Sequence, residues 1–202
     1  MLAIDSVTVE VPDPATAEDF YTAAFDLGTR LRVTASQEPT TGFRGFAMSL
    51  VVSQPGTVNN LFGDALRGGA TTLKPAAKGF WGYGGVLRDP YGTIWKIATS
   101  AKKDTGPANR HVDEIVLLLG VDDVAATKRF YVDRGLTVAK SFGRKYVEFA
   151  TSNIKLALYG RRAAAKDAGV SPDGGGSHRL VIGSSSAGTF TDPDGFEWKA
   201  GE

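Results

Sequence analysis

The sequence contains no cysteine and only two histidines. The absence of cysteine excludes disulfide bonds, thiolate catalysis and cysteine-ligated metal sites. His111 and His178 are therefore the only imidazoles available for metal binding or for general acid–base catalysis. No G-x-S-x-G elbow accompanies either histidine, so the serines near His178 do not indicate nucleophilic catalysis.

An excess of charge is also absent, because 23 Lys and Arg residues balance 22 Asp and Glu residues to give a net charge of +1. This balance gives no reason to expect a nucleic acid or a membrane surface as partner. No segment approaches the roughly 18 apolar residues of a membrane span, and the first six residues lack the pattern of a signal peptide. At 42% hydrophobic and 22% charged residues, the composition is typical of a soluble globular protein. We therefore expect a cytoplasmic location.

One eight-residue pattern is present and occurs twice. Residues 89–96 read DPYGTIWK and residues 192–199, 103 positions later, read DPDGFEWK, with Asp, Pro, Gly, Trp and Lys shared in register. Asp-Pro-x-Gly predicts a tight turn, since Asp bonds the backbone ahead, Pro presets φ and Gly accepts a positive φ. The residues that follow alternate between apolar and polar, which predicts a strand with one face on a core. Trp95 and Trp198 should face that core, opposite Lys96 and Lys199.

The rest of the chain repeats as well. Asp13-Pro14 and Asp123 each read as a helix start, and an aromatic pair follows seven residues after each aspartate, Phe20-Tyr21 and Phe130-Tyr131. The helical spacing predicts helices over 16–25, 58–67 and 124–134, with a short one near 162–168. Strands are predicted over 4–11, 31–33, 46–52, 112–119, 136–140, 145–149, 154–159 and 177–183.

These patterns predict an α+β fold, with helices on one face of curved sheets. The first domain should span 1–99 and the second 111–202, joined by a polar linker over 100–110 that contains Lys102, Lys103, Asp104, Gly106 and Pro107. Between Gly183 and Asp192 there is no room for a second helix in the second copy.

The ordered motifs resemble the glyoxalase/bleomycin-resistance/dioxygenase family, the vicinal oxygen chelate superfamily. The resemblance rests on the strand that opens at Ser6, on the Phe20-Tyr21 helix, and on Gly69-Ala70 before Lys74-Pro75. Trp81-Gly82-Tyr83 before Asp89-Pro90-x-Gly92 completes it. It covers nearly the whole chain as two tandem copies, and it implies paired βαβββ modules that form cup-like sheets with helices on the convex side.

The resemblance also implies a divalent metal on the concave face, held by His or Glu from opening strands and Glu from closing strands. The closing-strand position is Lys96 in the first copy and Lys199 in the second. A lysine ammonium has no lone pair and repels a cation. The opening strands offer Ser6, about Ala47, either Glu114 or Val116, and His178. We therefore predict no metal and no other cofactor.

The sequence favours a metal-free protein that binds a small molecule of anionic or aromatic character. Its pocket would have walls from Phe46, Trp81, Tyr83 and Tyr146, with Lys96 or Lys199 reaching an anionic group. The assembly expected is a monomer with an internal pseudo-dimer, or a homodimer.

Two alternatives remain open. One is a lyase, isomerase or dioxygenase with a reduced metal site near His178, or with a lysine as acid–base catalyst. The other is a vestigial site with a structural role. A further hypothesis pairs Glu114 with Lys199, two former ligand positions of opposite charge, as an ion pair in place of the metal.

Overall fold

A computed structural model describes residues 2–201. Its helices are α1 (Pro14–Ala24), α2 (Pro55–Arg67), α3 (Val124–Asp133), α4 (Arg161–Ala168) and the short 3-10 helix η1 (Gly28–Arg30). Its strands before residue 100 are β1 (Ala3–Ile4), β2 (Ser6–Val11), β3 (Leu31–Ala35), β4 (Thr40–Gly42), β5 (Phe46–Val51), β6 (Thr71–Gly79), β7 (Gly82–Arg88) and β8 (Ile94–Thr99). Those that follow are β9 (Glu114–Val121), β10 (Val138–Phe142), β11 (Tyr146–Phe149), β12 (Ser152–Gly160), β13 (Gly174–Gly176), β14 (Leu180–Ser184), β15 (Phe190–Thr191) and β16 (Glu197–Ala200).

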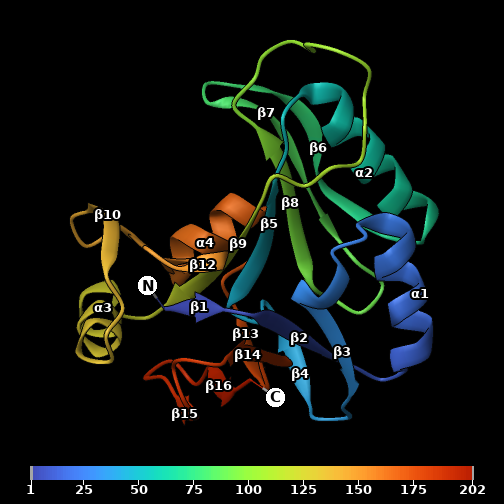
Figure 1. Ribbon diagram of the computed structural model, residues 1–202. Helices are drawn as coiled ribbons and strands as arrows, with labels where there is room; N and C mark the ends of the chain where they lie inside the picture. The colour runs from blue at the N-terminus through green and yellow to red at the C-terminus, as the bar shows by residue number, and fades with distance from the viewer. Residues whose placement is uncertain (1, 202) are drawn as a thin grey trace.

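The larger sheet has nine strands, in the order β10-β11-β12-β9-β5-β8-β7-β6, with β1 paired to β12 (Figure 1). Its centre is the antiparallel pair of β5 and β9, in which Met48 lies opposite Leu117. One half of this sheet therefore comes from before residue 100 and the other half from after it.

The smaller sheet has five strands, in the order β15-β16-β14-β2-β3. Its centre is the antiparallel pair of β14 and β2, in which Ile182 lies opposite Val7. A separate two-stranded ribbon joins β13 to β4. No helix separates β14 from β15, as the short sequence between them predicts. Both sheets thus combine strands from the two sequence copies.

The predicted α+β fold is confirmed, and its helices start where the sequence indicates. The Asp13 carboxylate accepts a hydrogen bond from the backbone N–H of Thr16, and that of Asp123 accepts from Ala125 and Ala126. These side chains satisfy N–H groups that a helix start leaves without intrahelical partners. Trp95 and Trp198 are fully buried on the helix side, as predicted, against Phe25 (ring centroids 4.5 Å apart) and Tyr131 (5.6 Å) respectively.

A single apolar core joins the two sheets. It contains both buried tryptophans, the valines of β2, and the alternate residues of β5 and β9 that face the helices. Because residues of both sequence copies belong to this one cluster, the two copies bury their apolar side chains against each other. Neither copy encloses a separate core of its own. Within residues 2–201 no helix is long and apolar enough to cross a membrane.

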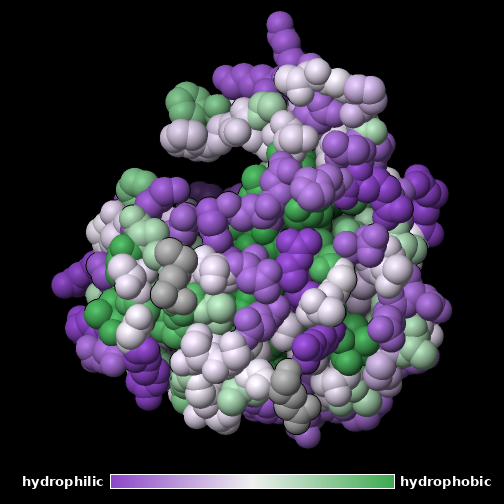
Figure 2. All heavy atoms as spheres, viewed as in Figure 1, coloured by the Kyte–Doolittle hydropathy of each residue, from purple (hydrophilic) through white to green (hydrophobic). Residues whose placement is uncertain are grey.

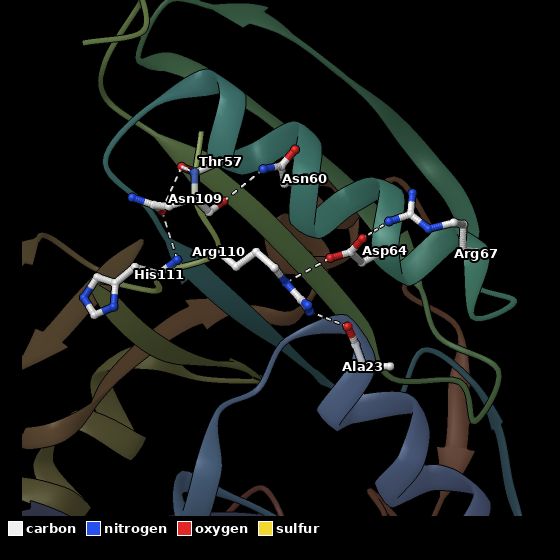
Figure 3. Close-up of polar contacts among 8 residues, drawn as sticks. All are labelled: Ala23, Thr57, Asn60, Asp64, Arg67, Asn109, Arg110 and His111. Atoms are coloured by element: carbon white, nitrogen blue, oxygen red, sulfur yellow. Dashed lines mark hydrogen bonds and ion pairs between the residues drawn. The ribbon is translucent and has the colours of Figure 1, made fainter. Parts of the chain in front are cut away.

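The linker is held against α1 and α2 (Figure 3). The buried Gln54 amide accepts hydrogen bonds from the backbone N–H groups of Thr105 (2.8 Å) and Gly106 (3.2 Å), and it donates to the carbonyl of Pro107 (2.9 Å). Further along, Arg110 pairs with Asp64 of α2 (3.0 Å) and also bonds the Ala23 carbonyl at the end of α1. The segment therefore has no regular secondary structure, yet it is fixed by side chains of the first copy.

Candidate functional site

The candidate site lies on the face of the nine-stranded sheet opposite α2, which we call the cup face. Strand alternation and register place alternate residues of five neighbouring strands there: Ala47, Ser49, Val86, Lys96, Glu114, Val116, Leu118 and Lys155. The intervening residues of β5 and β9 are buried on the helix side. The cup face is thus the only face of these strands that can present polar side chains.

Helix α4 covers part of the cup face, which the sequence does not predict. Its small residues Ala164, Ala165 and Ala168 are buried against Ala47 and Ile94. The helix contacts β9, β12 and β5, and a Cβ added at Gly120 would meet the Ala164 methyl group at 3.1 Å. Alanine and glycine therefore allow the helix to lie directly on the strands.

A cleft remains between α4 and the arm formed by β6 and β7. It encloses about 340 Å³, within the usual range for small-molecule sites, and Figure 2 shows a notch beneath this arm. Phe80 and Trp81 stand at the rim, 83% and 86% exposed, with their rings edge to face. The floor is backbone of β7 and the side chains of Lys96 and Ala98.

The charged groups of the cleft centre on one ion pair. The Lys96 ammonium lies 2.9 Å from the Asp167 carboxylate at the end of α4. Lys74 donates to the backbone carbonyls of Lys166 (2.8 Å) and Asp167 (2.7 Å). These carbonyls lie at the C-terminal end of α4, where the helix dipole stabilises a cation. Lys78 also lines the cleft. The cleft lining thus contains three lysines and one aspartate, so it carries net positive charge.

Two of the predicted aromatic walls face the other way. Phe46 is buried in the core on the helix side, so its predicted place in the pocket is wrong. Tyr83 points to α2, where its hydroxyl donates to Asn59 (2.8 Å), and only its backbone side reaches the cleft. In both cases the strand register determines which face of the sheet the side chain occupies, because a shift of one residue moves it to the opposite face.

Glu114 and Tyr146 both lie on the cup face, whereas Lys199 does not. Glu114 forms an ion pair with Lys155 on the neighbouring strand of the cup face. Tyr146 also lies on the cup face, where its hydroxyl donates to Glu148 (3.1 Å); burial, then the charge of Glu148, raises the pKa of its phenol. Lys199 lies in the smaller sheet, 4.0 Å from Glu197. The predicted Glu114–Lys199 ion pair is therefore wrong, because the two copies contribute these strands to different sheets.

His178 lies between two backbone carbonyls. Its Nδ1 is 2.5 Å from the oxygen of Arg44, its Nε2 is 2.9 Å from the oxygen of Asp194, and its ring stacks on Phe196. Both ring nitrogens are thus engaged by the protein. Arg44 holds the corresponding position beside the first turn, where it donates to the carbonyl of Tyr91 (2.5 Å). These contacts give His178 a role in fastening the second turn.

The described residues do not provide a metal-binding set. Within residues 2–201 no group of three or more His, Asp or Glu residues converges. Four-coordinate zinc and octahedral metals both require more donors than one carboxylate beside a lysine supplies. The side chains present at the cup face therefore do not fit the metal that the sequence resemblance implies.

Comparisons with solved structures identify the fold. Glyoxalase I from Zea mays matches with a TM-score of 0.62 at 15% identity, over 98% of this chain and 91% of that chain. A putative dioxygenase from Bacillus subtilis matches with a TM-score of 0.55 at 13% identity, over 90% of this chain and 70% of that chain. The chain has the vicinal oxygen chelate fold. The sequence matches no protein-family model and no curated protein.

Sequence reasoning missed the residues that α4 adds to this vicinal oxygen chelate sheet. Asp167 meets Lys96 across 71 positions of sequence, a pairing that no local pattern encodes. One signal was present in Ala164, Ala165 and Ala168, whose spacing places small residues on one face of a short helix. A helix face of small residues can pack closely on a sheet or be exposed to solvent. These three alanines therefore do not by themselves predict that the helix covers the sheet.

Proposed function

We propose that this protein binds a small aromatic anion, without metal, in the cleft between the β6–β7 arm and α4. The observation that carries the proposal is the Lys96–Asp167 ion pair beneath the exposed rings of Phe80 and Trp81. The pair places an ammonium at the position where the sequence resemblance implies a metal-ligating glutamate. A planar anion would stack on Trp81 and meet the ammonium groups of the cleft.

The net positive charge of the cleft supports an anionic ligand over a neutral one. Because Asp167 neutralises one of three ammonium groups, an incoming carboxylate finds cations that the protein does not fully compensate. The Lys74 ammonium already donates to carbonyls, which leaves Lys96 and Lys78 as the groups that approach the ligand. Charge-assisted hydrogen bonds of this kind are stronger than neutral ones.

The test is calorimetric titration with 2-naphthoate and with its neutral amide. We expect the carboxylate to bind more tightly than the amide, and Lys96→Met to remove that preference. Trp81→Ala should weaken both compounds through loss of the stacking surface. Lys199→Met is the matched control, because it removes the equivalent lysine of the second copy, which lies in the other sheet.

Equal affinities for carboxylate and amide, or an equal effect of Lys96→Met and Lys199→Met, would argue against the proposal. Elemental analysis after incubation with zinc, nickel, manganese and iron(II) completes the test. We expect no metal at one equivalent. A stoichiometric ion that increases naphthoate affinity and is lost in His178→Ala would support metal-dependent chemistry instead.

A further inference from the structure

Three partly buried arginines gather at the end of β7 opposite the cleft. Arg44 precedes β5, Arg88 ends β7 and Arg179 precedes β14. None of them takes part in an ion pair within residues 2–201, although surface arginines elsewhere in the chain do. Burial, then the positive charge of Arg179 and to a smaller extent that of Arg88, lower the pKa of Arg44, while the nearby Asp89 carboxylate acts in the opposite direction. Like charges that lie close together destabilise each other.

The hydrogen-bonding capacity of this cluster is not used up by the protein. Arg44 donates through Nη2 to Tyr91, but its Nη1 is buried without an acceptor among the described residues. The hydroxyl of Thr40 is likewise buried and unpaired within that part of the chain. By contrast, Arg179 bonds the Glu38 carbonyl through Nε (3.0 Å) and Nη2 (2.6 Å). A buried polar atom without a partner is costly and therefore calls for an explanation.

A small cavity of about 160 Å³ lies where these groups meet. Its lining consists of two guanidinium groups, two threonines and two glycines: Thr40, Thr41, Gly42, Arg44, Arg88 and Gly92. Gly42 and Gly92 have φ angles of +61° and +91°. A Cβ at Gly92 would come within 2.7 Å of Arg44 Nη2, so the turn leaves the guanidinium its space. No carboxylate contributes to the lining.

We propose that this cavity binds a phosphate-type oxyanion, either inorganic phosphate or the phosphoryl group of a small ester. The planar guanidinium group matches the geometry of phosphate oxygens. Two guanidinium groups also balance the charge of a phosphate dianion, whereas a carboxylate ligand carries only one negative charge. The Thr40 hydroxyl supplies a further donor. The cavity volume corresponds to about five waters at roughly 30 Å³ each, which leaves room for one phosphate group. This site is separate from the cleft and does not depend on its function.

The test is calorimetric and thermal titration with inorganic phosphate, at an ionic strength kept constant with sodium chloride. We expect saturable binding and a rise in Tm with the full-length protein. Arg88→Gln should weaken binding about 10- to 100-fold, as expected for the loss of a charged hydrogen-bonding partner. Arg144→Gln is the matched control, since it removes the same charge from an exposed turn outside the cavity.

Several outcomes separate the possibilities. If Arg88→Gln does not fold, Thr40→Val decides, because it keeps the shape and removes only the hydroxyl; weaker phosphate binding by it supports the site. Phenyl phosphate that binds as tightly as phosphate assigns the cavity to esters, and binding of inorganic phosphate alone assigns it to the free ion. The proposal is overturned if chloride raises Tm as much as phosphate, if acetate binds as tightly, or if Arg144→Gln weakens binding as much as Arg88→Gln.

Discussion

Asp89 and Asp192 connect each Asp-Pro-x-Gly turn to a helix. One oxygen of Asp89 accepts from the backbone N–H groups of Tyr91 and Thr93 (2.9 Å each). The other accepts from the hydroxyl of Tyr21 (2.7 Å) and the indole of Trp95 (2.9 Å). In the second copy Asp192 likewise accepts from the hydroxyl of Tyr131 (2.7 Å), but the indole of Trp198 donates to that hydroxyl (3.1 Å) and not to the carboxylate. The repeated Asp, Trp and helix Tyr of the sequence therefore form a buried hydrogen-bond network in each copy.

Asp89→Asn should lower the free energy of unfolding by about 1–3 kcal/mol at neutral pH. The substitution replaces one carboxylate oxygen by an NH2 group, which cannot accept the two hydrogen bonds that this oxygen receives. Burial raises the pKa of Asp89, outweighing the hydrogen bonds from Trp95 and Tyr21 that lower it. A raised folded-state pKa gives stability that is fully present below the ordinary value of 3.8 and is lost as pH rises through the folded value. The cost of Asp89→Asn should therefore be larger at pH 3.5 than at pH 7.

Urea unfolding of both proteins across that pH range checks the sign. Asp133→Asn, at an exposed position at the end of α3, is the control and should change stability little at any pH. A cost of Asp89→Asn that grows towards neutral pH would contradict the direction of the pKa shift.

At the scale of elements, the linker shows how a segment without helix or strand is held in place. Gln54, just before α2, is 3% exposed and meets three successive linker residues with both ends of its amide. The sequence of 100–110 predicts a linker, and in the structure this segment contains neither helix nor strand. Its attachment was not predictable, because the residue that provides it lies about 50 positions earlier.

Gln54→Ala should release the linker. We expect faster amide hydrogen exchange over 100–110 and faster tryptic cleavage at Lys102 and Lys103, since the backbone groups of Thr105, Gly106 and Pro107 lose their partner. Asn60→Ala, which removes only one exposed hydrogen bond to Asn109, is the control. Exchange and cleavage rates equal to those of the parent protein would show that the linker is held by other contacts.

At the scale of the whole molecule, the central strand pairs of both sheets join one sequence copy to the other. Residues 1–103 and 104–202, expressed separately, should each show no cooperative unfolding, because β5 and β9 would become open edges with exposed apolar faces. An equimolar mixture should regain a cooperative urea transition and the near-UV circular dichroism of the intact chain. A two-state transition in either fragment alone would contradict this.

The sequence predicts local features of this molecule better than long-range ones. The caps at Asp13 and Asp123, the duplicated turns and the buried faces of Trp95 and Trp198 follow from spacing and alternation, so they are predictable. The positions of Phe46, Tyr83 and Lys199 depend on strand register and on which strands share a sheet. Those choices are made by tertiary packing, which a single sequence records only indirectly.

Because α4 covers only part of the cup face, the two sides of that face should differ in how well they tolerate amino-acid substitutions. On the side of β9 and β12, methyl groups meet backbone, and a larger side chain at Ala164 or Gly120 would push the helix away from the strands. On the side of β6 and β7, the arm borders open space, and Trp81 accepts replacement without loss of core packing. Random mutagenesis should therefore divide into two classes by location: substitutions beneath α4 would reduce the yield of folded protein, whereas substitutions along the arm would change which molecules it binds.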